Sequence, residues 1–459
     1  MKNNKKSNRK KMNKLLICFV IVLILTVFVA TFLYVKFYDS KILSIVIPNI
    51  TSITKQVTKQ VETQEKLDDL DTNYIIKEYD IDEPLQNLIN QFPNNTNNIY
   101  NEAIRLSEPT KGINYKIDNT AGDENTPIFT GKRINIAITG LDARMGQVSK
   151  LADANHVISI LIETGEIEIT SIPRDTYCDL GFELDSTGLD LNKLTICRAK
   201  KGRNKYHEEL AKIARLDKIH YWVEFGFSQA MAIIEFLGFK DPASTLQVLR
   251  SRKGLGGDDF QRCYSQGQFI RQAILSHFNK FTGTLGGVLA RAGLLLVETN
   301  LTGDKVVEII NNLENVDFPK SAASVVVLVR PPLKIDYKAY DFNDETVANI
   351  VKKIEKFNKP RFDNGIEEPQ PIVDISEKLN KVIQSVIIDT ANNPNRVIST
   401  LSLYFEQRVW FQVKNKDERE KIRKQIAELL IAAYNKKNKK EEADKIKEII
   451  EAENKIFNP

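Results

Sequence analysis

The longest uninterrupted apolar run covers residues 15–35, which contain two threonines and no charged side chain. A helix of this length, rising about 1.5 Å per residue, matches the apolar core of a bilayer. A cleaved signal peptide has a shorter apolar part followed by a small-residue cleavage site, and no convincing A-x-A site follows here. We therefore expect an uncleaved transmembrane helix over residues 15–35.

Four later segments have the short alternating or continuously apolar pattern of strands. The first is RINIAITG, residues 133–140. The next two, HVISILIE and EIEITSIP, flank Thr164-Gly165, which predicts a hairpin. The last is ASVVVLV, residues 323–329, a buried strand ahead of Pro331-Pro332.

Helical spacing of apolar residues dominates elsewhere in the body of the chain. Residues 204–239 predict helices around the aromatic segment IHYWVEFGF, and GQFIRQAILSHFNKF predicts an amphipathic helix. From Asp374 onward the pattern is helical with mixed charge, which is typical of a solvated bundle or of an arm that binds a partner.

The same pattern predicts the domain boundaries. Residues 36–130 are polar and turn-rich, with stretches such as NQFPNNTNNIY, and we expect a stalk there. The main domain is expected at residues 131–336, a linker at 337–372 and a charged helical extension at 373–459.

Charge is concentrated at the start of the chain. The chain has 459 residues and a net charge of +5, and residues 1–14 carry seven cations and no acid. Removing those seven charges leaves −2, so the body lacks the basic character typical of nucleic-acid-binding domains. A basic arm before a transmembrane helix stays in the cytoplasm, so we expect the body to be extracytoplasmic.

Cysteine use excludes two classes of stabilising site. Cys18 lies in the apolar run, which leaves Cys178, Cys197 and Cys263 in the body. This odd number, without C-x-x-C spacing, predicts neither a disulfide framework nor a zinc site. Three buried thiols are favoured, and a single bridge stays open as the alternative.

Charged side chains gather where expected strands and helices meet loops. Three such places follow or precede the first three strands, and the fourth is LRSRKGLGGDDFQRCYSQ, residues 249–266. If the hairpin pairs with the first strand, the first three places share one end of the sheet, where ligands commonly bind. The residues concerned are Asp142 and Arg144, Asp153, Arg174 and Asp175, and then Arg250, Arg252, Asp258, Asp259, Arg262 and Gln266.

Two acids and several arginines converging at a sheet end suit a magnesium-bound pyrophosphate. Mg²⁺ takes one or two carboxylates plus phosphate oxygens, and arginine binds phosphate in a bidentate manner. Taken singly, however, such residues are usually solvated or paired with one another at about 0–1 kcal/mol. Their combination carries the hypothesis.

Four motifs together resemble the LytR-CpsA-Psr family of bacterial cell-envelope enzymes. They are GLDAR, LADANHVISI, ITSIPRDTY and LRSRKGLGGDDFQR followed by Gln266. The resemblance covers about residues 131–336, and S-I-P-R-D-T is its most specific piece. It implies an α/β fold, a central mixed β-sheet flanked by helices, to which the N-terminal transmembrane helix and the C-terminal α-helical extension are added.

The resemblance also implies an activity at the bacterial cell membrane. Family members transfer a glycopolymer from a polyprenyl-pyrophosphate carrier to peptidoglycan or another envelope acceptor, with Mg²⁺ assisting. By motif, Asp142 and Asp153 would hold the metal, and Arg144, Arg174 and Asp175 would be catalytic. Pyrophosphate would be bound by Arg250, Arg252, Arg262, Gln266 and Asp259.

Two departures from the family pattern favour an alternative function. Many members have an arginine where this chain has Leu151 and an Arg-Gln pair where it has Ser265-Gln266. His156 could replace one of these cations. If the losses are decisive, the chain is a membrane-tethered binder or scaffold for lipid-linked glycans rather than a transferase.

Two further functions are compared with these, and the place of a lipid-binding pocket is left open. A regulator of transcription fits poorly with an extracytoplasmic, near-neutral body, and a pyrophosphatase would use water as its acceptor. The apolar residues of YWVEFGFSQAMAIIEFLGF, 221–239, suit either a lipid pocket or the core, which sequence does not separate.

Overall fold

The computed structural model describes residues 113–124, 129–143, 145–148, 150–184, 190–358 and 374–457. The expected basic arm, the expected transmembrane helix and most of the expected stalk lie outside these ranges. Within them, no helix is long and apolar enough to cross a membrane.

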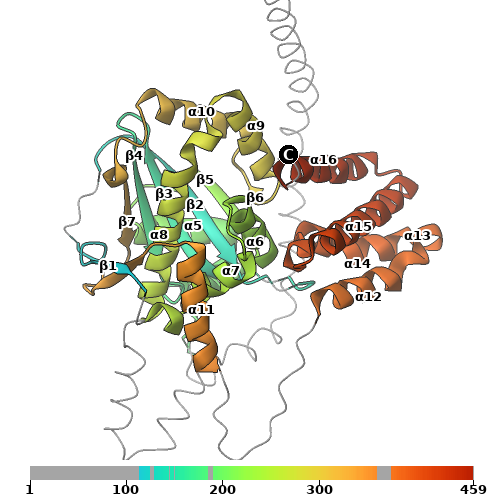
Figure 1. Cartoon of the computed structure of the whole chain (residues 1–459), viewed down its shortest axis with the longest axis horizontal. Coiled ribbons are helices and arrows are strands. Elements are labelled where there is room, and N and C mark those ends of the chain that lie inside the picture. Colours follow the sequence, from blue (N-terminus) through green and yellow to red (C-terminus); the bar gives the residue numbers. More distant parts are fainter. Residues whose placement is uncertain are drawn as a thin grey trace, which may run out of the picture. The chain divides into compact units, whose positions relative to one another are not determined.

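A six-stranded mixed sheet forms the centre of the α/β part (Figure 1), in the order β6-β5-β2-β3-β4-β7. The expected hairpin is confirmed, because β3 and β4 pair antiparallel through a turn in which Gly165 has φ +72°. β2 pairs antiparallel with β3 and parallel with β5, β4 runs parallel to β7, and β6 is antiparallel to β5. The bounds are Arg133–Leu141 for β2, Ala152–Leu161 for β3, Glu166–Ile172 for β4, Tyr221–Phe225 for β5, Glu298–Thr299 for β6 and Val325–Val329 for β7.

The helices expected around the aromatic segment of residues 204–239 are present, and the segment itself contains strand β5, which the sequence pattern did not indicate. Helices α5 (Gly202–Ile213) and α6 (Phe227–Phe236) flank it. The buried Glu224 hides the apolar pattern of this strand, and it is neutralised by Arg198 and Arg203, each 2.7 Å from its carboxylate. These two arginines hold the pKa of Glu224 at about 2 although burial favours the neutral acid.

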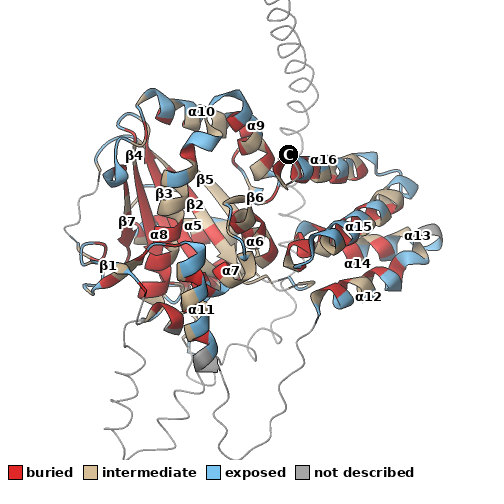
Figure 2. Ribbon diagram, viewed as in Figure 1, coloured by how far each residue is buried: buried red, intermediate tan, exposed pale blue. Residues whose placement is uncertain are grey.

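Both faces of the sheet are covered, which explains why its strands are apolar on both sides. Ile160, Ile167 and Ile169 belong to a core shared with α8 (Asp259–His277) and α10 (Gly303–Asn315). Ala137, Val157 and Ile172 belong to a second core shared with α4 (Leu194–Lys200) and α5. Figure 2 shows these strands as mostly buried.

The expected stalk and linker contribute structure to the domain. β1 (Tyr115–Asp118) pairs antiparallel with β8 (Tyr337–Tyr340). The Gln261 side chain pairs with both backbone groups of Lys338, donating to its carbonyl at 2.9 Å and accepting from its N–H at 2.8 Å. Strands this short give little periodicity, so the sequence pattern did not indicate them.

Helix α11 (Asp344–Asn358) also lies in the expected linker. Its Val347, Ile350 and Ile354 are buried in a third core with Val248 and Leu249 of α7 (Pro242–Arg250). This i, i+3, i+7 stripe is a helix signal that could have moved the boundary of the domain beyond residue 336.

The C-terminal residues form a helical bundle, as their pattern predicts. Its core contains the fully buried Trp410 together with Leu401 and Ile422. The bounds are Ile375–Ile387 for α12, Asp389–Asn392 for α13, Pro394–Glu406 for α14, Lys416–Lys436 for α15 and Lys440–Phe457 for α16. The remaining elements are α9 (Gly283–Leu294) and short 3₁₀ turns at Lys253–Leu255, Phe278–Phe281, Ala322–Ser324 and Val409–Gln412.

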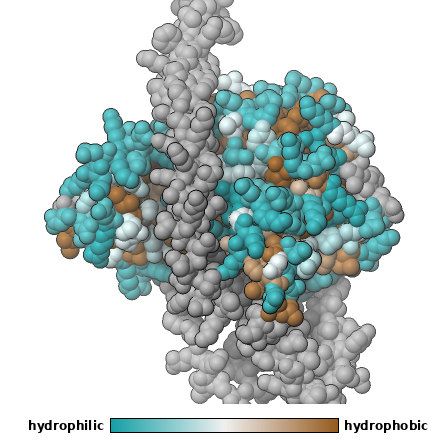
Figure 3. Space-filling view, turned by 180° about the vertical axis from the view of Figure 1, so that it is seen from behind, coloured by the Kyte–Doolittle hydropathy of each residue, from teal (hydrophilic) through white to brown (hydrophobic). Residues whose placement is uncertain are grey.

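The described surface is mostly hydrophilic on the face shown in Figure 3, where hydrophobic residues form small separate groups. Among the described residues, exposed large apolar side chains such as Leu285 and Ile388 lie on different elements. The three described cysteines are free and buried, which confirms the favoured expectation. Burial raises the pKa of Cys178 to about 12 and that of Cys197 to about 11.

We predict that close packing of α8 on the sheet depends on Gly267. A Cβ there would lie 2.8 Å from Val327 Cγ1 and would also meet Ser171 Oγ, so Gly267→Ala should destabilise the protein by about 1–3 kcal/mol through overpacking. At Gly293 of α9 a Cβ meets nothing within 4 Å, so Gly293→Ala should stabilise by about 0.4–1 kcal/mol. Urea unfolding of both variants checks this, and equal effects at the two sites would contradict it.

Candidate functional site

The charged residues meet at one edge of the central sheet. β2, β4, β5 and β7 run parallel to one another, and β3 runs the opposite way between β2 and β4. The carboxyl ends of those four strands and the start of β3 therefore share an edge. Asp142 follows β2, Arg174 and Asp175 follow β4, and Asp153 lies at the start of β3, which confirms that the first three charged places share one end.

A β-bulge presents Asp153, which lies inside β3 rather than before it as expected. Gly140 pairs with Ala154 and Leu141 with Ala152, so Asp153 has no partner residue on β2. The Asp142 N–H donates to the Leu151 carbonyl at 2.9 Å and continues the pairing. Bulges of this kind turn a side chain out of the regular alternation, and here the bulge brings Asp153 to Arg174.

The Asp259 carboxylate joins three arginine-bearing segments. Its Oδ1 lies 2.6 Å from Arg262 Nη2 and 3.1 Å from Arg252 Nε. Its Oδ2 accepts the backbone N–H of Arg174 at 3.0 Å. Asp259 is the first residue of α8, where the helix dipole favours a carboxylate. One acid at a helix start therefore sets the mutual positions of the three cations.

The Arg174 guanidinium is held most closely by Asp153, with 2.8 Å between Nη1 and Oδ1. Asp175, the next residue in the chain, lies 3.8 Å from Nε of Arg174 and 3.7 Å from Arg252. Burial lowers the pKa of Arg174, but the carboxylates of Asp153, Asp175 and Asp259 outweigh this and raise it above its usual value. Arg174 is a permanent cation at this edge.

The turn that carries Arg174 is fixed by the start of helix α4. The N–H groups of Thr195 and Leu194 donate to the carbonyls of Arg174 and Thr176, both at 2.9 Å. First-turn N–H groups have no partner within their own helix, so the turn supplies the acceptors that α4 needs. The Thr176 hydroxyl closes the turn by donating to the Pro173 carbonyl at 2.7 Å.

Arg174, Arg252 and Arg262 form a charged cluster with Asp153 and Asp259. Arg262 is the most buried cation of this cluster. Its side chain is only 6% exposed, and its Nε makes no hydrogen bond within the described structure. Burial lowers its pKa although Asp259 raises it, and Arg174 and Arg252 lower it further. Three guanidinium groups placed this close together favour an additional anion.

Three expected site residues lie apart from this cluster or outside the description. Arg250 is exposed and stacks on the Phe227 ring at 4.0 Å. Gln266 donates to the Leu249 carbonyl at 2.9 Å and thus supports the end of α7, close to Arg250 and Arg252 in the chain. Arg144 lies outside the described residues.

A cavity of about 430 Å³ opens beside the cluster. Asp175 and Asp259 line it, together with apolar residues that sequence reasoning did not single out: Pro173, Tyr177, Ile213, Phe260, Pro331 and Pro332. Lys212 and Arg215 at the end of α5 complete the lining. A polar wall next to an apolar wall suits an amphiphilic ligand.

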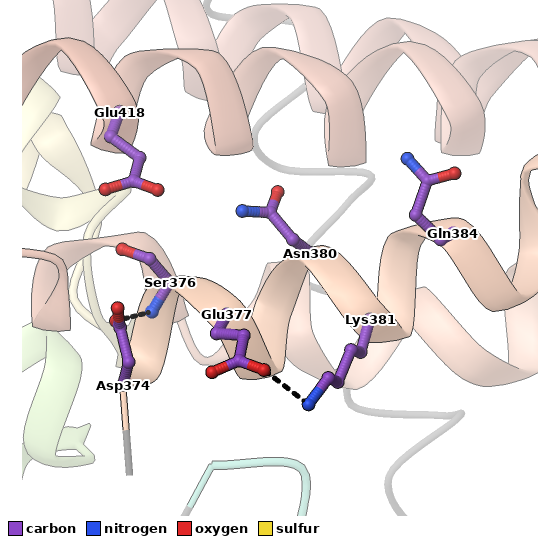
Figure 4. Close-up of a pocket in the computed structure, with 7 residues that line it drawn as sticks. All are labelled: Asp374, Ser376, Glu377, Asn380, Lys381, Gln384 and Glu418. Carbon is purple, nitrogen blue, oxygen red and sulfur yellow. Dashed lines mark hydrogen bonds and ion pairs between the residues drawn. The ribbon is translucent and has the colours of Figure 1, made fainter. Parts of the chain in front are cut away.

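A second cavity of about 460 Å³ lies in the helical bundle, between α12 and α15. Figure 4 shows its polar lining, in which Lys381 pairs with Glu377 at 2.5 Å and Asp374 accepts the Ser376 N–H at 2.9 Å. These contacts are a helix cap and a surface pair, so this cavity shows no chemistry of its own.

The expected metal ligands fit Mg²⁺ only as an incomplete set. Within the described ranges, no group of three or more histidine, cysteine, aspartate or glutamate side chains is arranged to hold a metal ion. Asp142 directly follows β2 and Asp153 lies on the neighbouring β3 at the bulge, and one oxygen of Asp153 already contacts Arg174. Mg²⁺ accepts such a set when substrate phosphates and water supply the other ligands.

Comparison with known proteins gives a family for this part of the chain. The model of the LytR_cpsA_psr family matches residues 89–238. Over these residues the chain is similar to the LytR-CpsA-Psr family. No curated protein matches the chain significantly.

Solved structures resemble about half of the chain. The transcriptional regulator yvhJ from Bacillus subtilis is 16% identical, with a TM-score of 0.34, and covers 50% of this chain and 98% of its own. B. subtilis TagV has the same identity and coverages with a TM-score of 0.33. TagT bound to LIIa-WTA is 16% identical over 52% of this chain and 96% of its own, with a TM-score of 0.33. Likeness at this level does not tell which substrate the present chain takes.

The residues that match the family model include only some of the cluster. Asp142, Asp153, Arg174 and Asp175 fall inside residues 89–238, whereas Arg252, Asp259 and Arg262 follow it. The contacts of Asp259 join the two sets, so the geometry extends the site beyond the matched residues.

At the two positions where the chain departs from the family pattern, Leu151 and Ser265, no cation is present. Both side chains are buried, and Ser265 Oγ accepts a hydrogen bond from Gln261 at 2.9 Å. His156 does not replace the missing charge. Burial lowers its pKa to about 4, and its Nδ1 lies 3.0 Å from Ser171 Oγ. The histidine is therefore neutral at pH 7.

We predict that His156 makes stability depend on pH in the acid range. Because its pKa falls from 6.5 in the unfolded chain to about 4 in the folded protein, its contribution is present above pH 6.5 and is lost as pH falls towards 4. The stability difference between wild type and His156→Gln should shrink by roughly 2–3 kcal/mol between pH 7.5 and pH 4.5. Urea unfolding at both pH values measures it, and a constant difference would show that folding does not lower the pKa of His156.

Proposed function

We propose that this chain transfers a glycopolymer from a polyprenyl-pyrophosphate carrier to peptidoglycan or another acceptor in the bacterial envelope. The convergence of Arg174, Arg252 and Arg262 on Asp259, beside a cavity with an apolar wall, carries the proposal. The match of residues 89–238 to the LytR-CpsA-Psr family supports glycopolymer transfer in general.

The arginines would bind the pyrophosphate and neutralise its oxygens while the acceptor hydroxyl attacks the sugar-linked phosphorus. The bond from that phosphorus to the bridging oxygen would break, and polyprenyl phosphate would leave. Phosphoryl transfer depends mainly on positioning and on charge stabilisation. Arg174 and Arg262 are held by short ion pairs, so they need little reorganisation to act. As the family resemblance implies, Arg144 and Arg250 would join them.

Asp142 and Asp153 would hold Mg²⁺ when it is bound, and the ion would offset the negative charge of the pyrophosphate. Gln266 would keep the chain around Arg252 in place through its bond to Leu249. Asp175, at the cavity and 3.7 Å from Arg252, would orient that arginine.

The cavity beside the cluster would take the part of the substrate adjoining the pyrophosphate. Its apolar wall, with Ile213 and Phe260, suits the lipid or the face of a sugar ring, and Tyr177 offers an exposed aromatic ring. The expected transmembrane helix at residues 15–35 would tether the chain to the cell membrane, where a lipid-linked substrate lies.

One set of observations favours a second candidate, a tethered binder of lipid-linked glycans without turnover. Leu151 and Ser265 are buried and uncharged, and the low pKa of His156 leaves it neutral. A binding site needs fewer cations than a site that must also stabilise a transition state.

The test follows polyprenyl phosphate released from a polyprenyl-pyrophosphate-linked saccharide by the full-length chain in detergent with Mg²⁺. We expect release by the wild type and a loss of roughly 10²–10³-fold in Arg174→Ala, by analogy with removal of one well-placed donor. Asp142→Ala should be similarly impaired. Arg291→Ala is the matched control, because Arg291 makes a partly exposed pair with Asp304 on another part of the domain.

The outcomes separate the candidates. Binding of the substrate without release by the wild type contradicts the transferase and supports the binder. Equal losses in Arg174→Ala and Arg291→Ala contradict the proposed site. Release that is unchanged by an added envelope acceptor, with water taking the glycan phosphate, identifies a pyrophosphatase instead.

A further inference from the structure

The loop that follows β2 is held by the C-terminal helical bundle. Asp142 begins this loop, and Gly146 and Gln147 lie further along it. The Gly146 N–H donates to Oε1 of Gln407 at 2.8 Å, and Nε2 of Gln407 donates to the Gln147 carbonyl at 2.8 Å. One side chain more than 250 residues away in sequence thus pairs with two backbone groups of the loop.

Shape complementarity accompanies these two bonds. Gly146 has φ +73°, and a Cβ there would meet the Tyr404 hydroxyl at 2.5 Å. The neighbouring Met145 packs against the apolar core of the bundle. On the other side of the loop, a Cβ at Gly226 would lie 3.0 Å from the Ala143 Cβ. The loop is therefore enclosed between α6 and the bundle.

The residue next to Gln407 anchors the bundle to the domain. Arg408 is buried with φ +54°, and it donates to the Leu295 carbonyl, just after α9, at 3.1 Å. Its Nε lies 3.1 Å from the fully buried Glu453, which also accepts from Trp410 Nε1 at 3.2 Å. A left-handed backbone at a non-glycine residue persists where the surrounding structure fixes it. Because Arg408 is fixed in this way, the backbone of the preceding Gln407 is held in place as well.

The domain uses the same device elsewhere. Gln261 pairs in this way with Lys338, and Gln272 donates to the Tyr340 carbonyl at 2.7 Å and accepts the Phe342 N–H at 2.9 Å. In both cases a glutamine on α8 fixes a segment that has little regular structure of its own. Gln407 does for the Asp142 loop what these glutamines do for the β8 segment.

We propose that Gln407 is a positioning residue, through which the C-terminal bundle sets the conformation of the loop that begins at Asp142. The proposal rests on the proposed function insofar as Asp142 serves the transfer reaction. It assigns the bundle a role inside the reaction cycle of the α/β domain, since neither bond forms unless the bundle is docked.

The chain offers a matched control at the same interface. Gln412 donates to the Ser228 hydroxyl on α6 at 2.8 Å, so Gln412→Ala removes a glutamine contact between bundle and domain that leaves the loop untouched. Gln407→Glu is the graded variant, because a glutamate keeps the acceptor for Gly146 and loses the donor to Gln147.

Hydrogen–deuterium exchange of the full-length chain in detergent, without substrate, tests the positioning. Loss of two neutral hydrogen bonds should speed exchange in the peptide spanning residues 142–148 by roughly 10-fold in Gln407→Ala, with a smaller rise in Gln407→Glu and none in Gln412→Ala. Unchanged exchange in Gln407→Ala, or an equal rise in Gln412→Ala, would overturn the proposal. Melting temperatures of the variants show whether the bundle still folds.

Release of polyprenyl phosphate then tests the consequence. We expect Gln407→Ala to lower kcat while Gln412→Ala retains wild-type kcat, and equal kcat values would contradict a role in the reaction. If the wild type releases nothing, the proposed function fails, yet the exchange result still decides whether Gln407 positions the loop.

Discussion

The site depends on one carboxylate at the start of a helix. Asp259 contacts Arg252 and Arg262 through one oxygen and the Arg174 backbone through the other, and these segments come from three separate parts of the sequence. Guanidinium groups repel one another at such distances unless an anion lies between them. Asp259 and Asp153 supply that charge in the structure described here, and a pyrophosphate would supply more of it.

The fold makes the contacts of Asp259 possible because it brings strand ends and helix starts to one edge of the sheet. Parallel β2, β4, β5 and β7 place their carboxyl ends on one edge, the bulge at Asp153 turns an acid towards Arg174, and the first turn of α4 holds the Arg174 loop. The bundle adds a fourth constraint through Gln407. Each constraint acts on the backbone that carries a charged side chain, so the geometry of the cluster is set before a ligand arrives.

Sequence patterns predicted the strands whose apolar residues alternate or run continuously, namely β2, β3, β4 and β7, and they predicted the helical C-terminal part. They did not indicate strand β5, because its apolar pattern is interrupted by Glu224, which is buried and paired with two arginines. They also did not indicate strand β8, which is only four residues long. Helix α11 carried a visible stripe that was assigned to a linker. These misses moved the expected boundaries of the domain inward.

The candidate site was also predicted only in part from the sequence. The S-I-P-R-D-T motif and the acids at strand ends pointed to the edge of the sheet, and strand direction alone brought them together. The bulge, the central place of Asp259 and the stacking of Arg250 on Phe227 depend on register and tertiary packing, which no local pattern records. His156 is neutral because burial lowers its pKa. The sequence allowed this histidine to replace a missing cation, and its burial in the fold prevents it.

The central claim is that buried arginines at this edge form a pyrophosphate site, and titration calorimetry with inorganic pyrophosphate tests it most directly. Arg262 and Arg271 both lie on α8, but Arg271 donates to the carbonyls of Val325 and Ala322, away from the cluster. The account predicts that Arg262→Met weakens pyrophosphate binding by roughly 10- to 100-fold, the effect of losing a charged hydrogen bond, and that Arg271→Met leaves it unchanged. Equal affinity of the wild type and Arg262→Met would contradict the account.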